Sequence, residues 1–275
     1  MRFAPAAFER LIERLYTAGA HGLYVNGYTG EGLLQDVEQR KRVAETAVRC
    51  APAGKAVIVH VGAHRTLDAL ELARHAATIG AAAISSLPPL GPYSSAEIRG
   101  YYQAICDASD LPVLVYYFPE MCPAIREPGL VQELLGLPNV VGLKFTDFDL
   151  YTLSLLKNSG GVVFNGRDEV LAAGLLMGAD GGIGTFYNLT PGLFVKVFDS
   201  ARAGQWEEAR QTQSRINELV EIILQFPLIP ATKLILAWQG IDCGPAMEPR
   251  RRLTDEEQKR LRELIRSSSF AGLAS

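Results

Sequence analysis

Seven short apolar runs recur along this chain of 275 residues, and each is followed by a segment with a helical pattern. The runs are continuously apolar rather than alternating, which is typical of parallel strands that helices cover on both faces. Strict alternation of strands and helices at this length predicts either a (β/α)₈ barrel or a doubly wound sheet. The runs are HGLYVNG (21–27), AVIVHVG (56–62), AAAISSLP (81–88), PVLVYYF (112–118), VVGLKFT (140–146), GGVVFNG (160–166) and GGIGTFY (181–187).

Helical patterns fill the segments between and after these runs. Apolar residues repeat three and four positions apart between Phe8 and Tyr16, and Ser94 and Glu97 have the spacing of a capping box. After Asn188 the strand-like runs stop. Four further helices are expected at 190–203, 205–225, 230–239 and 254–267, the last opened by Thr254 and Glu257.

The number of strands separates the possible folds. A barrel of this kind closes with eight strands, but seven are visible, and the residues before Ala6 are too few to supply another. We therefore expect an α/β fold, a (β/α)₈ TIM barrel with extra C-terminal helices, whose first strand is missing from this chain. The other possibility is that a segment with a helical pattern replaces that strand. The barrel is expected over 1–190 and the packed C-terminal helices over 191–275, as a single domain.

Composition and charge exclude several classes of protein. With 48% hydrophobic residues and a net charge of -3, the chain can bury one large core. It has no extended basic region, because none of its runs of like charges, such as that at 250–252, is longer than three residues. We expect no nucleic-acid partner. The N-terminal segment is amphipathic and no apolar stretch reaches membrane-spanning length, so we expect no membrane partner and a cytoplasmic location. The four cysteines lack metal-ligand spacing, which predicts free thiols and no metal.

Lys144 is the lysine that stands inside an apolar strand-like run. Burial of an ammonium group is costly, and desolvation lowers a lysine pKa until the neutral amine becomes a nucleophile. Such an amine can attack a carbonyl and form an iminium, which is the chemistry of class I aldolases. The position near the carboxyl end of a barrel strand favours this function. The alternative is a structural lysine that reaches solvent or pairs with Asp147.

Tyr116 and Tyr117 end the strand-like run before that of Lys144. If the two strands are neighbours, one phenol lies on the same face as the amine, where it can transfer protons. Two aromatic residues that pack on opposite faces of a strand are the structural alternative.

Two loops at predicted strand ends carry groups that could bind a substrate. In the turn 27–31, glycines and Thr29 allow a carboxylate to approach backbone N–H groups. Asp168 and Glu169 follow a later strand and could bind hydroxyl groups. An ordinary turn, and acidic residues that complement a helix dipole, are the alternatives.

Five segments occur in order along the chain: GYTGE (27–31), YYFP (116–119), GLKFT (142–146), FNGRDE (164–169) and GADGGIGTFYN (178–188). Together they resemble the N-acetylneuraminate lyase and dihydrodipicolinate synthase family, and the likeness is greatest to its N-acetylneuraminate lyases. The resemblance covers most of residues 8–245 and implies a (β/α)₈ barrel, usually a homotetramer, and Schiff-base chemistry on pyruvate without a cofactor other than the covalent bond to Lys144.

The resemblance also implies roles for individual residues. Lys144 matches the Schiff-base lysine, and Tyr116 matches the tyrosine of the Y-x-x-P motif. The substrate-binding positions implied by the same motifs are Tyr28, Thr29, Gly30, Thr146, Gly166, Asp168, Glu169 and Thr185. The implied reaction is the cleavage of a 2-oxo-3-deoxy sugar acid, foremost N-acetylneuraminate, to pyruvate and N-acetylmannosamine.

Three positions depart from the family pattern or distinguish its members. Tyr28 replaces the serine or threonine that usually precedes Thr29. Arg167 stands where lyases commonly have an uncharged residue. Its guanidinium could bind a distal anionic group of the substrate or neutralise Asp168. Met121 stands where dihydrodipicolinate synthases carry an arginine, which argues against that activity. The alternatives are a dehydratase or aldolase for another 2-oxo-3-deoxy acid, a dihydrodipicolinate synthase-like enzyme, or a non-catalytic barrel that binds a sugar acid.

Overall fold

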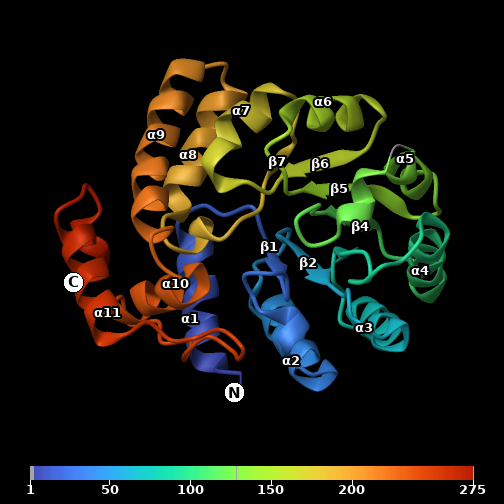
Figure 1. The fold of residues 1–275 in the computed structure, drawn as a ribbon, viewed down its shortest axis with the longest axis horizontal. Coiled ribbons are helices and arrows are strands. Elements are labelled where there is room, and N and C mark those ends of the chain that lie inside the picture. The colour runs from blue at the N-terminus through green and yellow to red at the C-terminus, as the bar shows by residue number, and fades with distance from the viewer. Residues whose placement is uncertain (1–2, 128, 275) are drawn as a thin grey trace. The chain divides into compact units, whose positions relative to one another are not determined.

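The structure is a computed structural model that describes residues 3–127 and 129–274. Its central element is a parallel sheet of seven strands, arranged in the order in which they occur in the sequence (Figure 1). Each predicted apolar run contributes one strand, so this part of the prediction is confirmed. The strands are β1 (Gly22–Val25), β2 (Ala56–His60), β3 (Ala83–Ser86), β4 (Val113–Tyr117), β5 (Val140–Phe145), β6 (Val162–Asn165) and β7 (Gly181–Gly182).

Helices connect the successive strands and cover the outer side of the curled sheet (Figure 1). A helix returns the chain to the start of the next parallel strand, so all the strands have their carboxyl ends at the same edge. Among the described residues, β1 and β7 are the two ends of the sheet and no eighth strand joins them. The helices are α2 (Val37–Cys50), α3 (Thr66–Thr78), α4 (Ser95–Ala108), α5 (Leu130–Leu135) and α6 (Leu150–Asn158), with short turns at Gly32–Leu34 and Pro123–Arg126.

The burial of the strands explains their composition. All five residues of β4 are buried, because the interior side chains of the sheet cover one face and the helices cover the other. The predicted capping box at the start of α4 is confirmed: the Ser94 side chain accepts a hydrogen bond from the Glu97 N–H, and the Glu97 carboxylate accepts one from the Ser94 N–H.

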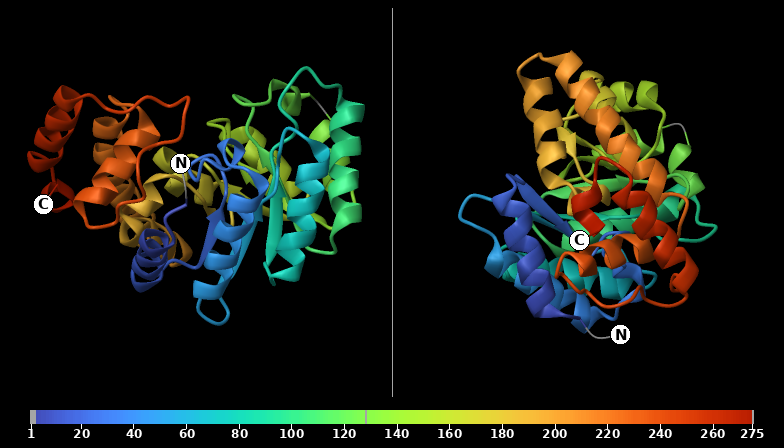
Figure 2. Two further views of the ribbon diagram at one scale, coloured as in Figure 1. Left: turned by 90° about the horizontal axis from the view of Figure 1, so that it is seen from below. Right: turned by 90° about the vertical axis from the view of Figure 1, so that its left-hand side faces the viewer.

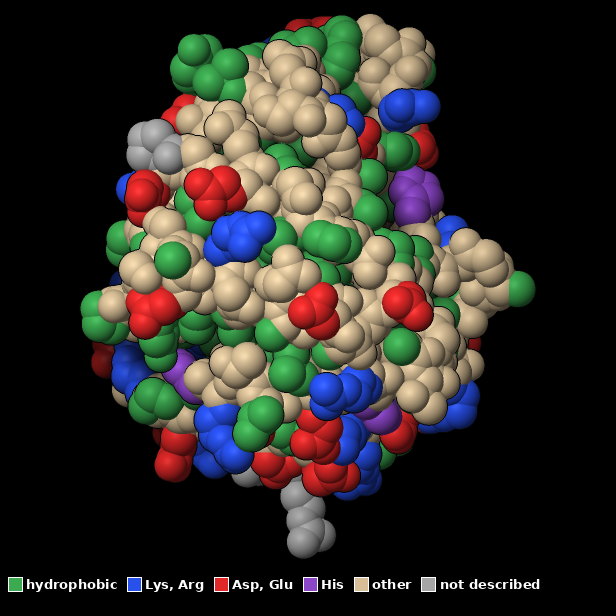
Figure 3. Space-filling view, turned by 90° about the vertical axis from the view of Figure 1, so that its right-hand side faces the viewer, with side chains coloured by type: hydrophobic (Ala, Val, Ile, Leu, Met, Phe, Trp, Pro, Cys, Tyr) green, Lys and Arg blue, Asp and Glu red, His purple; other side chains and the backbone are tan. Residues whose placement is uncertain are grey.

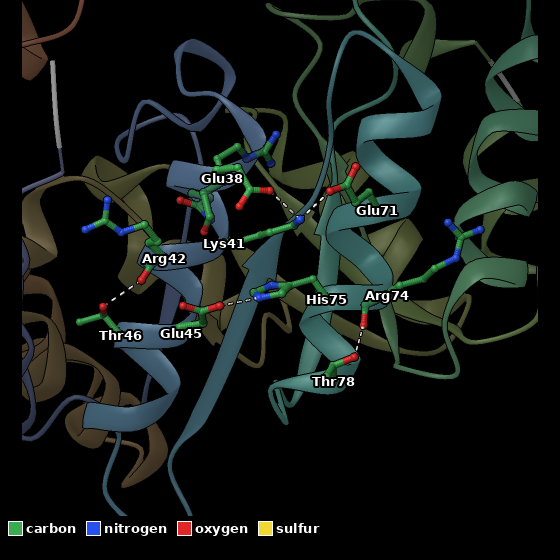
Figure 4. A network of polar contacts seen from close by, with 11 residues as sticks. Glu38, Lys41, Arg42, Glu45, Thr46, Glu71, Arg74, His75 and Thr78 are labelled. Carbon is green, nitrogen blue, oxygen red and sulfur yellow. Dashed lines mark hydrogen bonds and ion pairs between the residues drawn. The ribbon is translucent and has the colours of Figure 1, made fainter.

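Ion pairs join α2 to α3 on the outside of the sheet (Figure 4). Lys41 lies between Glu38 and Glu71, and Glu45 lies 2.9 Å from His75 Nε2. Water and salt screen ion pairs at the surface, so pairs of this kind contribute little to stability. This network therefore belongs to the helical layer and not to the interior of the sheet.

The chain divides into two compact units. The sheet and its helices, residues 21–167 and 173–183, form one. The other contains 3–20, 168–172 and 184–274, so the first helix groups with the C-terminal helices. The expected boundary at residue 190 stays a prediction.

The second unit consists of helices. Among its longer helices α8 packs along α9, and α9 also contacts α10 and α11, which are coloured orange to red in Figure 2. The four helices predicted after Asn188 are confirmed, as is the capping box of Thr254 and Glu257. The elements are α1 (Pro5–Thr17), α8 (Pro191–Arg202), α9 (Trp206–Ile223), α10 (Leu228–Trp238) and α11 (Asp255–Arg266), with short turns at Asp168–Val170, Phe186–Asn188 and Ala271–Ala274, and α7 (Leu171–Leu176) runs from this unit into the other.

Within the described residues, no single helix is long and apolar enough to cross a membrane, although α9 and α10 pass that test as a pair that is bent by 108°. All four cysteines are free thiols, and two of them, Cys106 and Cys122, are buried. Burial raises the pKa of the Cys106 thiol to about 11.

Candidate active site

The structure places Lys144 and Tyr116 directly opposite each other on neighbouring strands β5 and β4. Lys144 Nζ lies 3.9 Å from the centroid of the Tyr116 ring and 4.4 Å from that of the Tyr24 ring on β1. Only 6% of Lys144 and 2% of Tyr116 are exposed. The amine is therefore buried between aromatic faces in the interior of the sheet.

The sequence did not show which of the two adjacent tyrosines faces Lys144, and the alternation of side chains along β4 decides this. Tyr116 shares the face of Lys144, whereas Tyr117 lies opposite Phe145 and stacks on its ring with a centroid distance of 4.7 Å. Because successive residues of a strand point to opposite faces, one tyrosine reaches the amine and the other packs away from it. The prediction that one phenol lies on the face of the amine is confirmed.

Tyr24 is a residue of this interior that the sequence analysis missed. Its ring packs edge to face on Tyr116 at 6.1 Å, and its hydroxyl donates a hydrogen bond of 2.9 Å to Ser85 Oγ on β3. Desolvation, followed by the nearby Tyr116, raises the pKa of Tyr24 well above its usual value. Its phenol therefore stays protonated at neutral pH and positions the ring beside Lys144.

His60 and Arg40 form a buried polar network beneath these rings. His60 Nε2 accepts a hydrogen bond of 3.1 Å from the Leu87 N–H, and Arg40 donates to the carbonyl oxygens of His60 and Gly62 at 2.7 and 2.9 Å. Burial lowers the pKa of His60 well below its usual value, and the charges of Arg40 and Lys144 lower it further. The imidazole is neutral and holds the ends of β2 and β3 together.

The turn after β1 carries three of the predicted substrate-binding residues. Two backbone hydrogen bonds close it, from the Glu31 N–H to the Tyr28 carbonyl and from the Gly32 N–H to the Gly27 carbonyl. The Tyr28 ring packs edge to face against Phe118 at 5.9 Å. Thr29 and Gly30 lie within this turn, at the carboxyl edge of the sheet.

Thr146 and Gly166 come together at the ends of β5 and β6. A Cβ atom on Gly166 would lie 2.0 Å from Thr146 Oγ1, so only glycine fits beside this hydroxyl. Thr146 Oγ1 is buried and has no hydrogen-bond partner among residues 3–127 and 129–274. An unsatisfied buried hydroxyl is costly in a folded protein and is often explained by a bound ligand or water.

The other three predicted site residues lie together in the helical unit. Asp168 Oδ2 accepts a hydrogen bond of 2.7 Å from the Phe186 N–H, next to Thr185. A Cβ atom on Gly184 would lie 1.4 Å from Asp168 Oδ1, so this carboxylate fits against bare backbone. Part of its role is therefore to hold the loop that carries Thr185.

Two side chains of α9 hold the segment that contains Asp168 and Glu169. Gln213 Nε2 donates to the Asp168 carbonyl at 2.9 Å, and Gln213 Oε1 accepts from the Ala172 N–H at 3.0 Å. Asn217 Nδ2 donates to the Glu169 carbonyl at 3.0 Å. The sequence analysis missed both amides, since they are more than 40 positions from the backbone that they hold.

The structure shows the partners of two charged residues for which the sequence suggested others. Asp147, suggested as a partner of Lys144, forms an ion pair with Arg126 at 2.9 Å. Arg167, suggested as a partner of Asp168, forms an ion pair with Glu120.

Comparison with known proteins identifies the family. The model of the dihydrodipicolinate synthetase family matches residues 2–268, and the chain belongs to this family. A protein of Rhizobium meliloti (strain 1021) described as N-acetylneuraminate lyase is 36% identical over 262 residues, 94% of this chain and 87% of that protein. An N-acetylneuraminate lyase of Mediterraneibacter gnavus is 32% identical over 271 residues, 94% of this chain and 85% of that protein.

Solved structures agree with this assignment. The wild-type sialic acid aldolase of Ruminococcus gnavus superposes with a TM-score of 0.91 at 31% identity, over 96% of this chain and 90% of that chain. A variant of the same aldolase with its catalytic lysine mutated matches equally well. The fold is therefore that of the TIM-barrel aldolases with extra C-terminal helices. Together the family and the relatives place the chain among the class I, pyruvate-dependent aldolases, which are carbon–carbon lyases.

Proposed function

We propose that this enzyme cleaves a 2-oxo-3-deoxy sugar acid, foremost N-acetylneuraminate, to pyruvate and N-acetylmannosamine. The observation that carries the proposal is the buried amine of Lys144, directly opposite Tyr116 at the carboxyl edge of the sheet. The names of the relatives favour N-acetylneuraminate over other sugar acids.

In the proposed reaction, Lys144 Nζ attacks C2 of the open-chain 2-oxo acid, and loss of water leaves an iminium ion. Tyr116 takes the proton of the C4 hydroxyl and passes its own phenolic proton on toward solvent while the C3–C4 bond breaks. The electrons of that bond pass to the iminium nitrogen, which gives an enamine and releases the aldehyde. Protonation of C3 and addition of water then release pyruvate and restore the amine.

The remaining residues bind the two halves of the substrate in this proposal. The hydroxyl of Thr29 and the backbone N–H of Gly30 hold the carboxylate of the pyruvate half, beside the hydroxyl of Thr146. Three polar side chains and the backbone at Gly166 hold the hydroxyl groups of the sugar half. These side chains are Asp168, Glu169 and Thr185.

The decisive test is borohydride reduction in the presence of pyruvate, followed by peptide mass mapping. We expect a stable adduct on Lys144 in the wild-type chain and none in Lys144→Met. A folded chain that binds pyruvate without forming the adduct would instead be a non-catalytic sugar-acid-binding barrel.

Product analysis separates the possible substrates once the adduct is established. We expect N-acetylmannosamine and pyruvate in equal amounts from N-acetylneuraminate. If another 2-oxo-3-deoxy acid is consumed and N-acetylneuraminate is not, the enzyme is an aldolase or dehydratase for that acid. Condensation of pyruvate with an amino aldehyde would indicate a dihydrodipicolinate synthase-like activity.

A further inference from the structure

We infer that Arg167 forms a binding subsite for an anionic group on the half of the substrate remote from its 2-oxo acid. The inference rests on the proposed aldolase function and goes beyond it, because it ranks sugar acids with a second anionic group above N-acetylneuraminate as substrates of the same Lys144 chemistry. These substrates are 2-oxo-3-deoxy acids that carry a second oxyanion, a carboxylate or a phosphate, on the aldehyde-derived half. The single carboxylate of N-acetylneuraminate belongs to the pyruvate half, so this subsite would distinguish anionic substrates from it.

The guanidinium of Arg167 lies between two aromatic rings. Its Cζ atom is 4.4 Å from the centroid of Phe148 and 5.6 Å from that of Phe118. Phe118 also stacks on Tyr116 at 5.7 Å, with an angle of 17° between the rings. The rings thus connect the guanidinium to the residue opposite Lys144, in loops that follow three adjacent strands, β4, β5 and β6.

The ion pair of Arg167 is uneven in its exposure to solvent. The Arg167 side chain is 16% exposed, whereas that of its partner Glu120 is 60% exposed. A cation that has lost most of its water gains from any anion that reaches it, while a carboxylate in water loses little when it is released. Glu120 is therefore a partner that a substrate anion can replace.

The guanidinium of Arg167 can also donate more hydrogen bonds than Glu120 accepts. Glu120 contacts Nη2, and Nε is buried without a hydrogen-bond partner within the described part of the chain. Carboxylates and phosphates bind an arginine through two parallel hydrogen bonds, which use adjacent nitrogens of the fork. An oxyanion on Nη2 and Nε would satisfy both nitrogens.

The backbone that carries Arg167 is held firmly. The fully buried Asn165 at the end of β6 donates a hydrogen bond of 2.6 Å from Nδ2 to the Arg167 carbonyl. Binding groups on rigid elements need little reorganisation to receive a ligand. The alternative is a structural role, in which the ion pair between Arg167 and Glu120 connects the loops after β4 and β6 and binds no substrate.

The test uses aldol synthesis from pyruvate and three acceptors that differ at one carbon. They are N-acetylmannosamine, its 6-phosphate and the corresponding uronic acid, which are neutral, phosphorylated and carboxylated. In each case C3 of the pyruvate enamine bonds to the aldehyde carbon, whose oxygen takes a proton, and water releases the product from Lys144. We expect the wild-type enzyme to have the higher kcat/KM with at least one anionic acceptor, and that acceptor identifies the source of the oxyanion.

Three variants separate a subsite from a structural tie. Arg167→Gln should lower kcat/KM for the preferred anionic acceptor by about tenfold or more, and leave that for the neutral acceptor nearly unchanged. Glu120→Gln removes the competing carboxylate and should lower KM for the anionic acceptor. Arg126→Gln is the matched control, because it removes another ion-paired guanidinium of the same region and should not alter the preference.

Equal effects of Arg167→Gln on neutral and anionic acceptors, or a wild-type preference for the neutral acceptor, would overturn the inference. If Glu120→Gln left the KM for the anionic acceptor unchanged, Glu120 would not compete with substrate and the inference would also fail. Borohydride trapping with pyruvate accompanies each variant. Absence of the Lys144 adduct in the wild-type enzyme would instead reject the proposed aldolase function.

Discussion

The two adjacent tyrosines of β4 allow a hydroxyl group to be tested apart from its ring. Tyr116 lies opposite Lys144 and stacks on Phe118, while Tyr117 stacks on Phe145 on the other face. Removal of either hydroxyl leaves an aromatic ring in place. Differences between the two variants therefore report proton transfer rather than packing.

We expect Tyr116→Phe to form the pyruvate adduct on Lys144 but to lose cleavage activity by about 10²–10⁴-fold, since general acid–base catalysis contributes that much. Tyr117→Phe should retain most of the activity. The measurements are borohydride trapping and the rate of pyruvate release. Equal activity of the two variants would show that the Tyr116 hydroxyl transfers no essential proton.

His60 predicts how stability depends on pH. In the unfolded chain the imidazole takes up a proton near pH 6.5, whereas burial lowers the pKa of His60 in the folded chain. The contribution of His60 to the free energy of unfolding is therefore complete above pH 6.5 and is lost as the pH falls. We expect the stability advantage of the wild-type chain over His60→Gln to shrink below about pH 6.5, by up to about 1.4 kcal/mol per pH unit. Urea unfolding of both proteins at pH 7.5 and 5.5 measures it. A constant difference would show that the buried imidazole is not neutral.

At the scale of the elements, the sequence predicts features that depend on residues close together in the chain. The two capping boxes and the four C-terminal helices were predictable because caps and apolar repeats are local signals. Tyr24 and Phe118 were not predictable as neighbours of the site, because their ring contacts depend on which strands are adjacent and in which register. The partner of Arg167 is likewise 47 positions away.

Gln213 shows how one element positions residues of another. Its amide fixes the backbone at Asp168 and Ala172, so we expect Gln213→Ala to raise the KM for the sugar acid while the pyruvate adduct on Lys144 still forms. Gln211→Ala is the control, because that amide contacts Glu207 on the exposed face of the same helix. Steady-state kinetics and borohydride trapping measure both properties. An unchanged KM would mean that the segment keeps its position without this amide.

At the scale of the whole molecule, the net charge is small. The net charge is only -3, and on the face in Figure 3 the acidic and basic side chains are interspersed. A strong field of one sign, which nucleic-acid binding requires, is not seen on that face.

Exposed apolar side chains indicate where copies of the chain could contact each other. Tyr151 and Leu155 are 68% and 47% exposed, and they lie four positions apart on α6.

Residues four positions apart share one side of a helix, and burial of apolar surface stabilises association by about 25 cal/mol per Å². The family resemblance implies a homotetramer, so we predict a mass of about four times the 29.9 kDa of one chain and expect α6 to contribute to a contact between copies. Light scattering coupled to size-exclusion chromatography measures the mass. Tyr151→Glu should reduce it by placing a charge in that contact, whereas Leu67→Glu, at an equally exposed position on α3, should not. A tetramer that is unaffected by Tyr151→Glu would place the contacts elsewhere, and a wild-type monomer would contradict the predicted assembly.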